Sequence, residues 1–159
     1  MLQFWAEIFA WPEEGFWIHI GRVSIRLTVA TLLGAVVGLE RHREGKFAGL
    51  RTHMLVALGS ALFTLIPQEA QMTTADLSRV IQGVAAGIGF LGAGTILKLE
   101  EQHRIEGLTS AASVWVTAAV GMSVGAGWIW PAVVGVIWGW IILSIIHHLE
   151  QYLRNKQAP

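Results

Sequence analysis

The stretch GVAAGIGFLGAG, residues 83–94, contains the spacing Gly87-x-Gly89-x-x-Gly92, which is typical of loops that bind a dinucleotide. Such a loop connects a strand to a helix and lets the backbone approach a pyrophosphate at the helix N-terminus. Here, however, the chain has no charge and no proline from Val80 to Leu97, a run that would span about 27 Å as a helix at about 1.5 Å per residue. That length matches the hydrocarbon core of a bilayer. We therefore expect a membrane-spanning helix here and no nucleotide site.

Ionisable side chains at membrane depth are costly and often functional, which singles out Arg26, Glu40, Asp76 and Arg79. We expect Arg26 and Asp76 at similar depth near the outer ends of their helices. Two interpretations are open. Arg26 and Asp76 either form an ion pair in a polar pocket, or Arg26 extends to the interface while Asp76 only caps a helix.

A second group of polar residues lies in GLERHREGKFAGLRTH (38–53) and GLTSAAS (107–113). Thr52 and Thr109 are each placed to cap a helix N-terminus. Two such positive helix ends beside Arg51 would suit an anion or a carboxylate of a partner. The alternative is that these basic loops only follow the positive-inside rule and contact anionic lipid.

The residue types and their spacing give little support for a catalytic site or a metal site. Magnesium prefers octahedral oxygen ligands, and the expected intramembrane carboxylates, Glu40 and Asp76, fall at opposite ends of their helices. The chain has no cysteine, and His147 and His148 are adjacent rather than at a metal-binding spacing. No serine or histidine is placed for nucleophilic catalysis. We expect no enzyme, no metal site and no cofactor.

The composition is that of an integral membrane protein, with 53% hydrophobic residues, 14% charged residues and a mean hydropathy of +0.54. Eleven basic residues balance eleven acidic ones, which argues against a nucleic-acid partner. Membrane lipids are the expected surroundings. The apolar segments predict an all-α bundle of about five transmembrane helices in a single domain, with no soluble domain, at about residues 18–39, 52–66, 80–97, 108–127 and 131–148.

The connections between these segments differ in charge. Lysine and arginine gather in residues 40–51, in the connection before residue 108 and in the C-terminal tail, whereas residues 67–79 carry only Arg79. Because cytoplasmic loops are rich in basic residues, we expect the N-terminus outside and the C-terminus in the cytoplasm. Pro131 suits the first turn of the last helix, and Trp128 and Trp130 suit a membrane interface.

The glycines of the third segment predict close helix packing. At about 100° per residue, small residues fall on two opposite faces, separated by a bulky stripe of Val80, Val84, Ile88 and Leu91 that we expect to face lipid. A helix that is small on two faces lets two neighbours approach, so we place it at the centre of the bundle. Its packing residues would be Gly83, Gly87, Gly89, Gly92 and Gly94. Similar pairs occur at Gly34/Gly38, Gly121/Gly125 and Gly135/Gly139.

Three blocks of the sequence carry a family resemblance: GLERHREGKFAGLRTHMLVALGSALF (38–63), DLSRVIQGVAAGIGFLGAGTIL (76–97) and IEGLTSAASVWVTAAVGMSVGAGW (105–128). They resemble, in order, the signature blocks of the MgtC/SapB family of bacterial inner-membrane proteins. The resemblance places one signature at Glu40, Arg41, Gly49, Leu50, Arg51, Thr52 and His53. It places another at Gly107, Leu108 and Thr109.

The resemblance implies a protein of the bacterial inner membrane linked to magnesium limitation, acid or intracellular stress and, in some pathogens, virulence. Restraint of the ATP synthase has been proposed for some members. Well-known members carry a soluble C-terminal domain that we do not expect in this chain. Two function classes stay open: a non-enzymatic modulator that docks on other inner-membrane proteins, and an oligomeric small-ion transporter or channel. We expect a homo-oligomer, with a dimer favoured.

Overall fold

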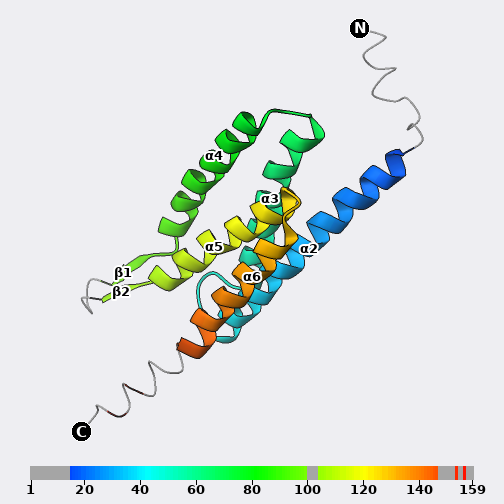
Figure 1. The fold of residues 1–159 in the computed structure, drawn as a ribbon. Coiled ribbons are helices and arrows are strands. Elements are labelled where there is room, and N and C mark those ends of the chain that lie inside the picture. The colour runs from blue at the N-terminus through cyan, green and yellow to red at the C-terminus, as the bar shows by residue number, and fades with distance from the viewer. Residues whose placement is uncertain (1–14, 100–103, 147–152, 154–155, 157–159) are drawn as a thin grey trace.

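The structure, a computed structural model, describes residues 15–99 and 104–146 together with 153 and 156, and it is helical almost throughout. The helices are α2 (Phe16–Arg43), α3 (Leu50–Glu69), α4 (Thr74–Ala93), α5 (Leu108–Gly125) and α6 (Ile129–Trp140), which continues as a π-helical segment, η2 (Ile141–Ile146). These helices pack side by side as a bundle (Figure 1), which confirms the predicted all-α membrane fold.

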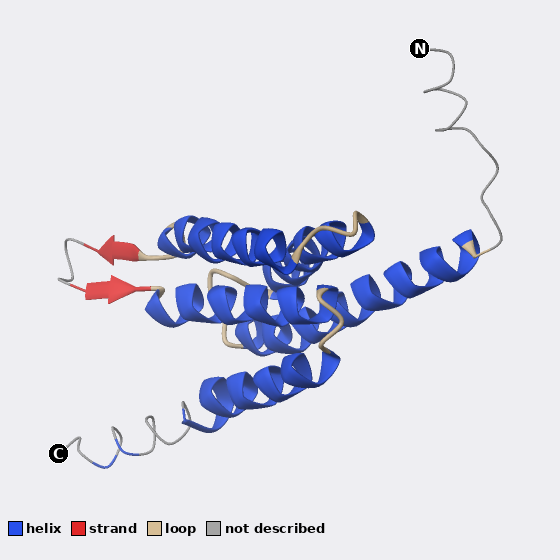
Figure 2. Ribbon diagram, turned by 45° about the horizontal axis from the view of Figure 1, so that its top comes forward, coloured by secondary structure: helices blue, strands red, loops and turns tan. Residues whose placement is uncertain are grey.

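A two-stranded antiparallel hairpin joins α4 to α5 and was not predicted. Strand β1 (Leu97–Leu99) pairs with β2 (Arg104–Glu106), with Lys98 opposite Ile105. The strands extend beyond the helices at one end of the bundle (Figure 2), which we call the hairpin end. The predicted third segment therefore stops earlier than Leu97, because α4 ends at Ala93 and the Thr95 hydroxyl donates to the Gly92 carbonyl at 2.8 Å.

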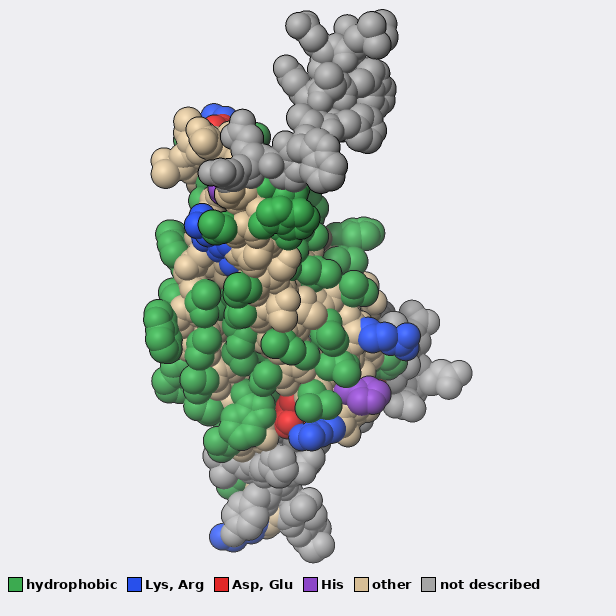
Figure 3. All heavy atoms as spheres, turned by 90° about the vertical axis from the view of Figure 1, so that its right-hand side faces the viewer, with side chains coloured by type: hydrophobic (Ala, Val, Ile, Leu, Met, Phe, Trp, Pro, Cys, Tyr) green, Lys and Arg blue, Asp and Glu red, His purple; other side chains and the backbone are tan. Residues whose placement is uncertain are grey.

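Among the described residues, four spans are long and apolar enough to cross a membrane: Phe16–Arg43, Leu50–Glu69, Leu108–Gly125 and Ile129–Ile146. Helix α4 is less apolar than these four spans, since its first turns carry Asp76 and Arg79. Large apolar side chains lie exposed over the outside of the bundle; Phe90, for example, is 82% exposed. On the face drawn in Figure 3, hydrophobic side chains cover most of the surface and charged side chains gather mainly toward the two ends.

The centre of the bundle is α5, which contacts α2, α3, α4 and α6. The expectation of a central glycine-rich third helix is wrong, because α4 packs mainly on α5 and, more sparsely, on α3. Gly92 is buried against Ala111 of α5, whereas a Cβ added at Gly83, Gly87 or Gly89 would meet nothing within 4 Å. At Gly94 such an atom would approach only carbonyls of its own chain segment, those of Leu91 and Phe90.

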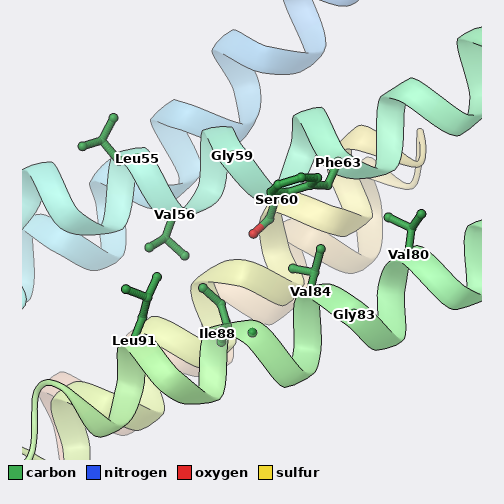
Figure 4. A pocket seen from close by; sticks show the side chains of 11 residues that line it. Leu55, Val56, Gly59, Ser60, Phe63, Val80, Gly83, Val84, Ile88 and Leu91 are labelled. Atoms are coloured by element: carbon green, nitrogen blue, oxygen red, sulfur yellow. The ribbon is translucent and has the colours of Figure 1, made fainter.

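The predicted phase of α4 is also wrong. Ile88, assigned to the lipid-facing stripe, is buried in a small core with Ala48, Val114 and Ala118. The whole stripe, Ile88 included, lines a cleft of about 590 Å³ between α3 and α4 (Figure 4). Because α4 is small on two faces, periodicity alone could not show which face turns toward α5.

The close packing predicted for small residues occurs instead on both sides of α3. A Cβ at Gly34 of α2 would lie 2.7 Å from both the Ala57 Cβ and the His53 carbonyl oxygen. On the other side, a Cβ at Gly121 of α5 would overlap the Ala57 carbonyl oxygen, and one at Gly125 would overlap that of Ala61. The backbones of α2, α3 and α5 can approach this closely only because these positions are glycine.

This packing predicts opposite results for two glycine-to-alanine changes. Gly121→Ala forces a methyl group into the α3 backbone and should lower the stability of the purified protein by about 1–3 kcal/mol, the usual cost of overpacking. Gly83→Ala adds the same methyl group in open space on another helix and should be neutral or slightly stabilising. The measurement is thermal unfolding in detergent. Equal melting temperatures for the two variants would contradict the placement of α5.

Candidate functional site

A buried polar pair ties the start of α3 to α5 at the hairpin end. The ring of His53 is fully buried, with Nδ1 2.9 Å from the Gly49 carbonyl oxygen and Nε2 3.1 Å from the Ser113 hydroxyl. Because a carbonyl oxygen can only accept, Nδ1 carries the hydrogen in the neutral ring. The Ser113 hydroxyl oxygen lies 3.1 Å from Nε2 and 2.8 Å from the Ser110 carbonyl oxygen, so its single hydrogen is donated to one of these two acceptors. His53, predicted only through the family resemblance, is therefore a structural tie between the two helices.

Further along the interface between α3 and α5, which we call the α3·α5 seam, hydroxyl groups are buried in close packing. The Thr64 hydroxyl lies 3.1 Å from the Met122 carbonyl oxygen across the interface, and the Thr117 hydroxyl donates to the Ser113 carbonyl at 2.8 Å. Both threonines are completely buried. The hydroxyls thus bond to backbone carbonyls in a seam where Gly121 and Gly125 bring the two helices into contact.

Helix α2 ends at the hairpin end with a tight turn that positions charged residues. The Gly45 amide donates to the His42 carbonyl and the Lys46 amide to the Arg41 carbonyl, the two hydrogen bonds of a Schellman motif. Gly45 has φ +66°, a conformation that glycine adopts without strain. The turn folds Glu44 back onto Arg41, with Nη1 of Arg41 2.8 Å from Oε2 of Glu44.

The Arg41–Glu44 ion pair lies in a pocket of about 430 Å³, which we call the hairpin-end pocket. The two side chains are only 3% and 14% exposed. The pocket is also lined by Lys46, by the start of α5 from Gly107 to Ser110, and by apolar residues of η2. It therefore combines a buried cation, a buried carboxylate and a positive helix end.

The N-terminus of α5 carries no side-chain cap. Its N-cap is Gly107, with φ +91°, and a Cβ there would overlap the Thr95 carbonyl oxygen, so another residue cannot replace it without movement. The first amides of a helix have no intrahelical acceptor, and they give this end a partial positive charge. The predicted cap at Thr109 is wrong, because Thr109 lies inside the first turn with its side chain exposed.

The structure separates the other residues predicted at this end. Helix α3 starts at Leu50 with Gly49 as N-cap, so Thr52 does not cap it either. Arg51 and Thr52 are exposed and do not line the hairpin-end pocket, and Glu40 is half-buried outside its lining. Of the predicted residues, Arg41 and Thr109 meet there, together with Gly107 and Leu108 of the second family signature. The sequence analysis did not single out Glu44 and Lys46. Both follow Arg41 in the tight turn that ends α2.

At the opposite end, Arg26 and Asp76 do not pair, which corrects that interpretation. Nη1 of Arg26 donates to Oε1 of Gln68 at 2.9 Å and to the Gly125 carbonyl at 3.3 Å. Gln68 in turn donates to the Ala126 carbonyl at 2.8 Å. Arg26 and Gln68 thus satisfy the last carbonyls of α5, where a cation is also favoured by the helix dipole.

Asp76 serves its own helix, as the alternative interpretation states. It forms a capping box with Thr73 and accepts from Nη1 of Arg79 at 3.2 Å. Arg79 is largely exposed, with 78% of its side chain accessible. Gln68 was missed because α3 runs past Pro67 to Glu69, beyond the predicted end at residue 66.

Within the residues that the structure describes, no three His, Cys, Asp or Glu side chains come together as they would to hold a metal ion.

A single bundle of apolar helices with its charged groups at the two ends defines a polytopic α-helical membrane protein. The chain belongs to the MgtC family, whose family model matches residues 27–152. No solved structure matches it.

The chain is 43% identical over 156 residues to SrpB of Synechococcus elongatus, covering 91% of this chain and 84% of SrpB. It is 40% identical over 139 residues to YhiD of Escherichia coli K12, covering 83% of this chain and 64% of YhiD. It is 38% identical over 139 residues to MgtC of Brucella abortus, covering 86% of this chain and 56% of that protein. The chain thus spans less than two thirds of the length of the latter two relatives.

The arrangement of Arg26 predicts which partner it is energetically coupled to. In a double-mutant cycle, Arg26→Leu and Gln68→Leu should show a coupling on the order of 1 kcal/mol, because each change leaves the other side chain without its partner. Arg26→Leu and Asp76→Leu should be additive within about 0.5 kcal/mol. Thermal unfolding in detergent measures both cycles. Coupling to Asp76 but not to Gln68 would contradict the observed geometry.

Proposed function

We propose that this chain is a non-enzymatic modulator of other membrane proteins, acting in the bacterial inner membrane under magnesium limitation. The observation that carries the proposal is the closed α3·α5 seam. Glycines let backbone touch backbone along the axis of the bundle, and the charged chemistry lies at the ends. Such a chain is suited to docking rather than to holding a path for ions within one protomer.

The link to magnesium rests on the family. One relative is named "Putative magnesium transporter YhiD", and others are named MgtC. Members of the MgtC family are not known as enzymes. We extend the magnesium link to this chain as part of the proposal. The proposal also includes a role of the chain in acid or intracellular stress and in virulence.

Orientation and assembly belong to the same proposal. The hairpin end carries exposed Arg43, Lys46 and Arg51, and the proposal puts this end in the cytoplasm and the N-terminus outside, because cytoplasmic loops are rich in basic residues. The open face of α4 at Gly83 and Gly87 would let a helix of a second copy approach closely, in keeping with a homodimer in contact with membrane lipid.

The second candidate is an oligomeric transporter for a small ion related to magnesium. It is favoured by the line of buried polar side chains on α3 and α5, from His53 to Thr64 and from Ser110 to Thr117. In this case the path would have to form between copies or after the seam opens, since the hydroxyls bond to backbone in closed packing.

A growth test and a flux test together separate the two candidates. The chain should restore growth at low magnesium to a bacterium lacking its own family member. Proteoliposomes containing it should take up Mg²⁺ no faster than protein-free vesicles. Replacing the exposed Arg43 and Arg51 by Gln should remove most of the rescue, because a partner's contact surface loses two charges.

Arg79→Gln is the matched control, an exposed arginine at the other end of the bundle, and it should leave growth unchanged. Reporter fusions on both sides of the membrane check that the variants keep their topology. Protein-dependent Mg²⁺ uptake into the vesicles would overturn the modulator and favour the transporter.

A further inference from the structure

Two buried polar atoms of side chains that line the hairpin-end pocket have no hydrogen-bond partner among the residues that the structure describes. One is Nε of Arg41, a donor on a side chain that is 3% exposed. The other is Oε1 of Glu44, an acceptor. The Arg41–Glu44 ion pair uses only Nη1 and Oε2, at 2.8 Å. A buried donor or acceptor without a partner typically costs about 1–3 kcal/mol, so the two atoms call for a ligand or ordered water in the pocket.

Other donors converge on the same space. The uncapped N-terminus of α5 lines the pocket through Leu108 and Thr109, and the amides of these first-turn residues have no acceptor within the helix. Lys46 lines it as well. Helix N-termini and lysine or arginine side chains together are the usual means by which proteins hold a phosphate group.

Glu44 restricts the kind of anion. A plain anion such as sulfate would satisfy the donors but would lie beside a carboxylate to which it can donate nothing. A phosphate group accompanied by an N–H or O–H donor satisfies both sides, because its oxygens accept from Arg41 and its donor reaches Oε1 of Glu44.

We propose that the hairpin-end pocket binds a phosphate group that also presents a hydrogen-bond donor. Two sources share this chemistry: free hydrogen phosphate, with its P–OH group, and the headgroup of phosphatidylethanolamine, with its ammonium group. The apolar wall formed by Ile142 and Ile146 of η2 would suit the start of an acyl chain in the second case. The inference goes beyond the proposed function and holds whether the chain modulates a partner or carries an ion.

The test measures the thermal stability of the full chain, purified in phosphate-free detergent, at constant ionic strength. Sodium phosphate at neutral pH is compared with sodium sulfate. In a second arm, the chain is reconstituted into vesicles of phosphatidylethanolamine or of phosphatidylcholine, whose quaternary ammonium group has no N–H donor. Stabilisation by phosphate over sulfate identifies the free anion as ligand, and stabilisation by phosphatidylethanolamine over phosphatidylcholine identifies the headgroup. No preference in either arm would overturn the proposal.

Variants tie the preference to this pocket. Lys46→Gln removes an exposed side chain and should fold, yet weaken binding of the preferred ligand about tenfold, the loss expected for one charge-assisted hydrogen bond. Glu44→Gln keeps an oxygen for Arg41 but removes the carboxylate. It should abolish the preference for phosphate over sulfate, or for ethanolamine over choline.

Arg43→Gln, an exposed change directly before Glu44 in the chain but outside the pocket lining, is the control and should leave both preferences intact. If Glu44→Gln kept the wild-type preference, the ligand would bind elsewhere and the assignment to this pocket would be wrong.

Discussion

The contact of three helix backbones at Ala57 is the constraint on which the rest of this structure depends. Gly34 of α2 meets the side chain of Ala57 from one side, and Gly121 of α5 meets its carbonyl from the other. Lipid tails are as apolar as leucine, so membrane helices associate through close packing and hydrogen bonds rather than through the hydrophobic effect. Because both positions are glycine, α3 can pack closely against α2 on one face and against α5 on the other.

The position of polar chemistry follows from this contact. Since the seam is closed, its hydroxyls bond to backbone carbonyls, as Thr64 does with Met122. Polar side chains lie at the two ends of α5: Arg26 and Gln68 donate to its last carbonyls, while the Arg41–Glu44 pair faces its first turn. Helix α5 thus has a cationic group at its negative end and a ligand-sized pocket at its positive end. Helix α4 packs against the outside, where Gly92 meets Ala111.

The sequence predicted those parts of the fold that depend on apolar length and local turn chemistry. The helical segments, the start of α6 around Pro131 and the cap formed by Asp76 agree with the structure. It could not predict the phase of α4, because its small residues occupy two faces and either could turn toward α5. It misplaced both threonine caps, because Gly49 and Gly107 end the preceding turns and start the helices instead. The partner of Arg26, Gln68, was not predicted, because α3 was expected to end before Pro67, whereas the helix continues past this proline.

Closure of the α3·α5 seam can be measured directly, because the chain contains no native cysteine. Single thiols at Thr64→Cys and Thr117→Cys, both at fully buried positions, can be compared with Thr52→Cys, at an exposed position. The structure predicts that a small water-soluble thiol reagent labels position 52 in the reconstituted protein and labels positions 64 and 117 only after denaturation. Labelling of position 117 in the native protein as fast as position 52 would show water along the seam and contradict the closed packing proposed for this protein.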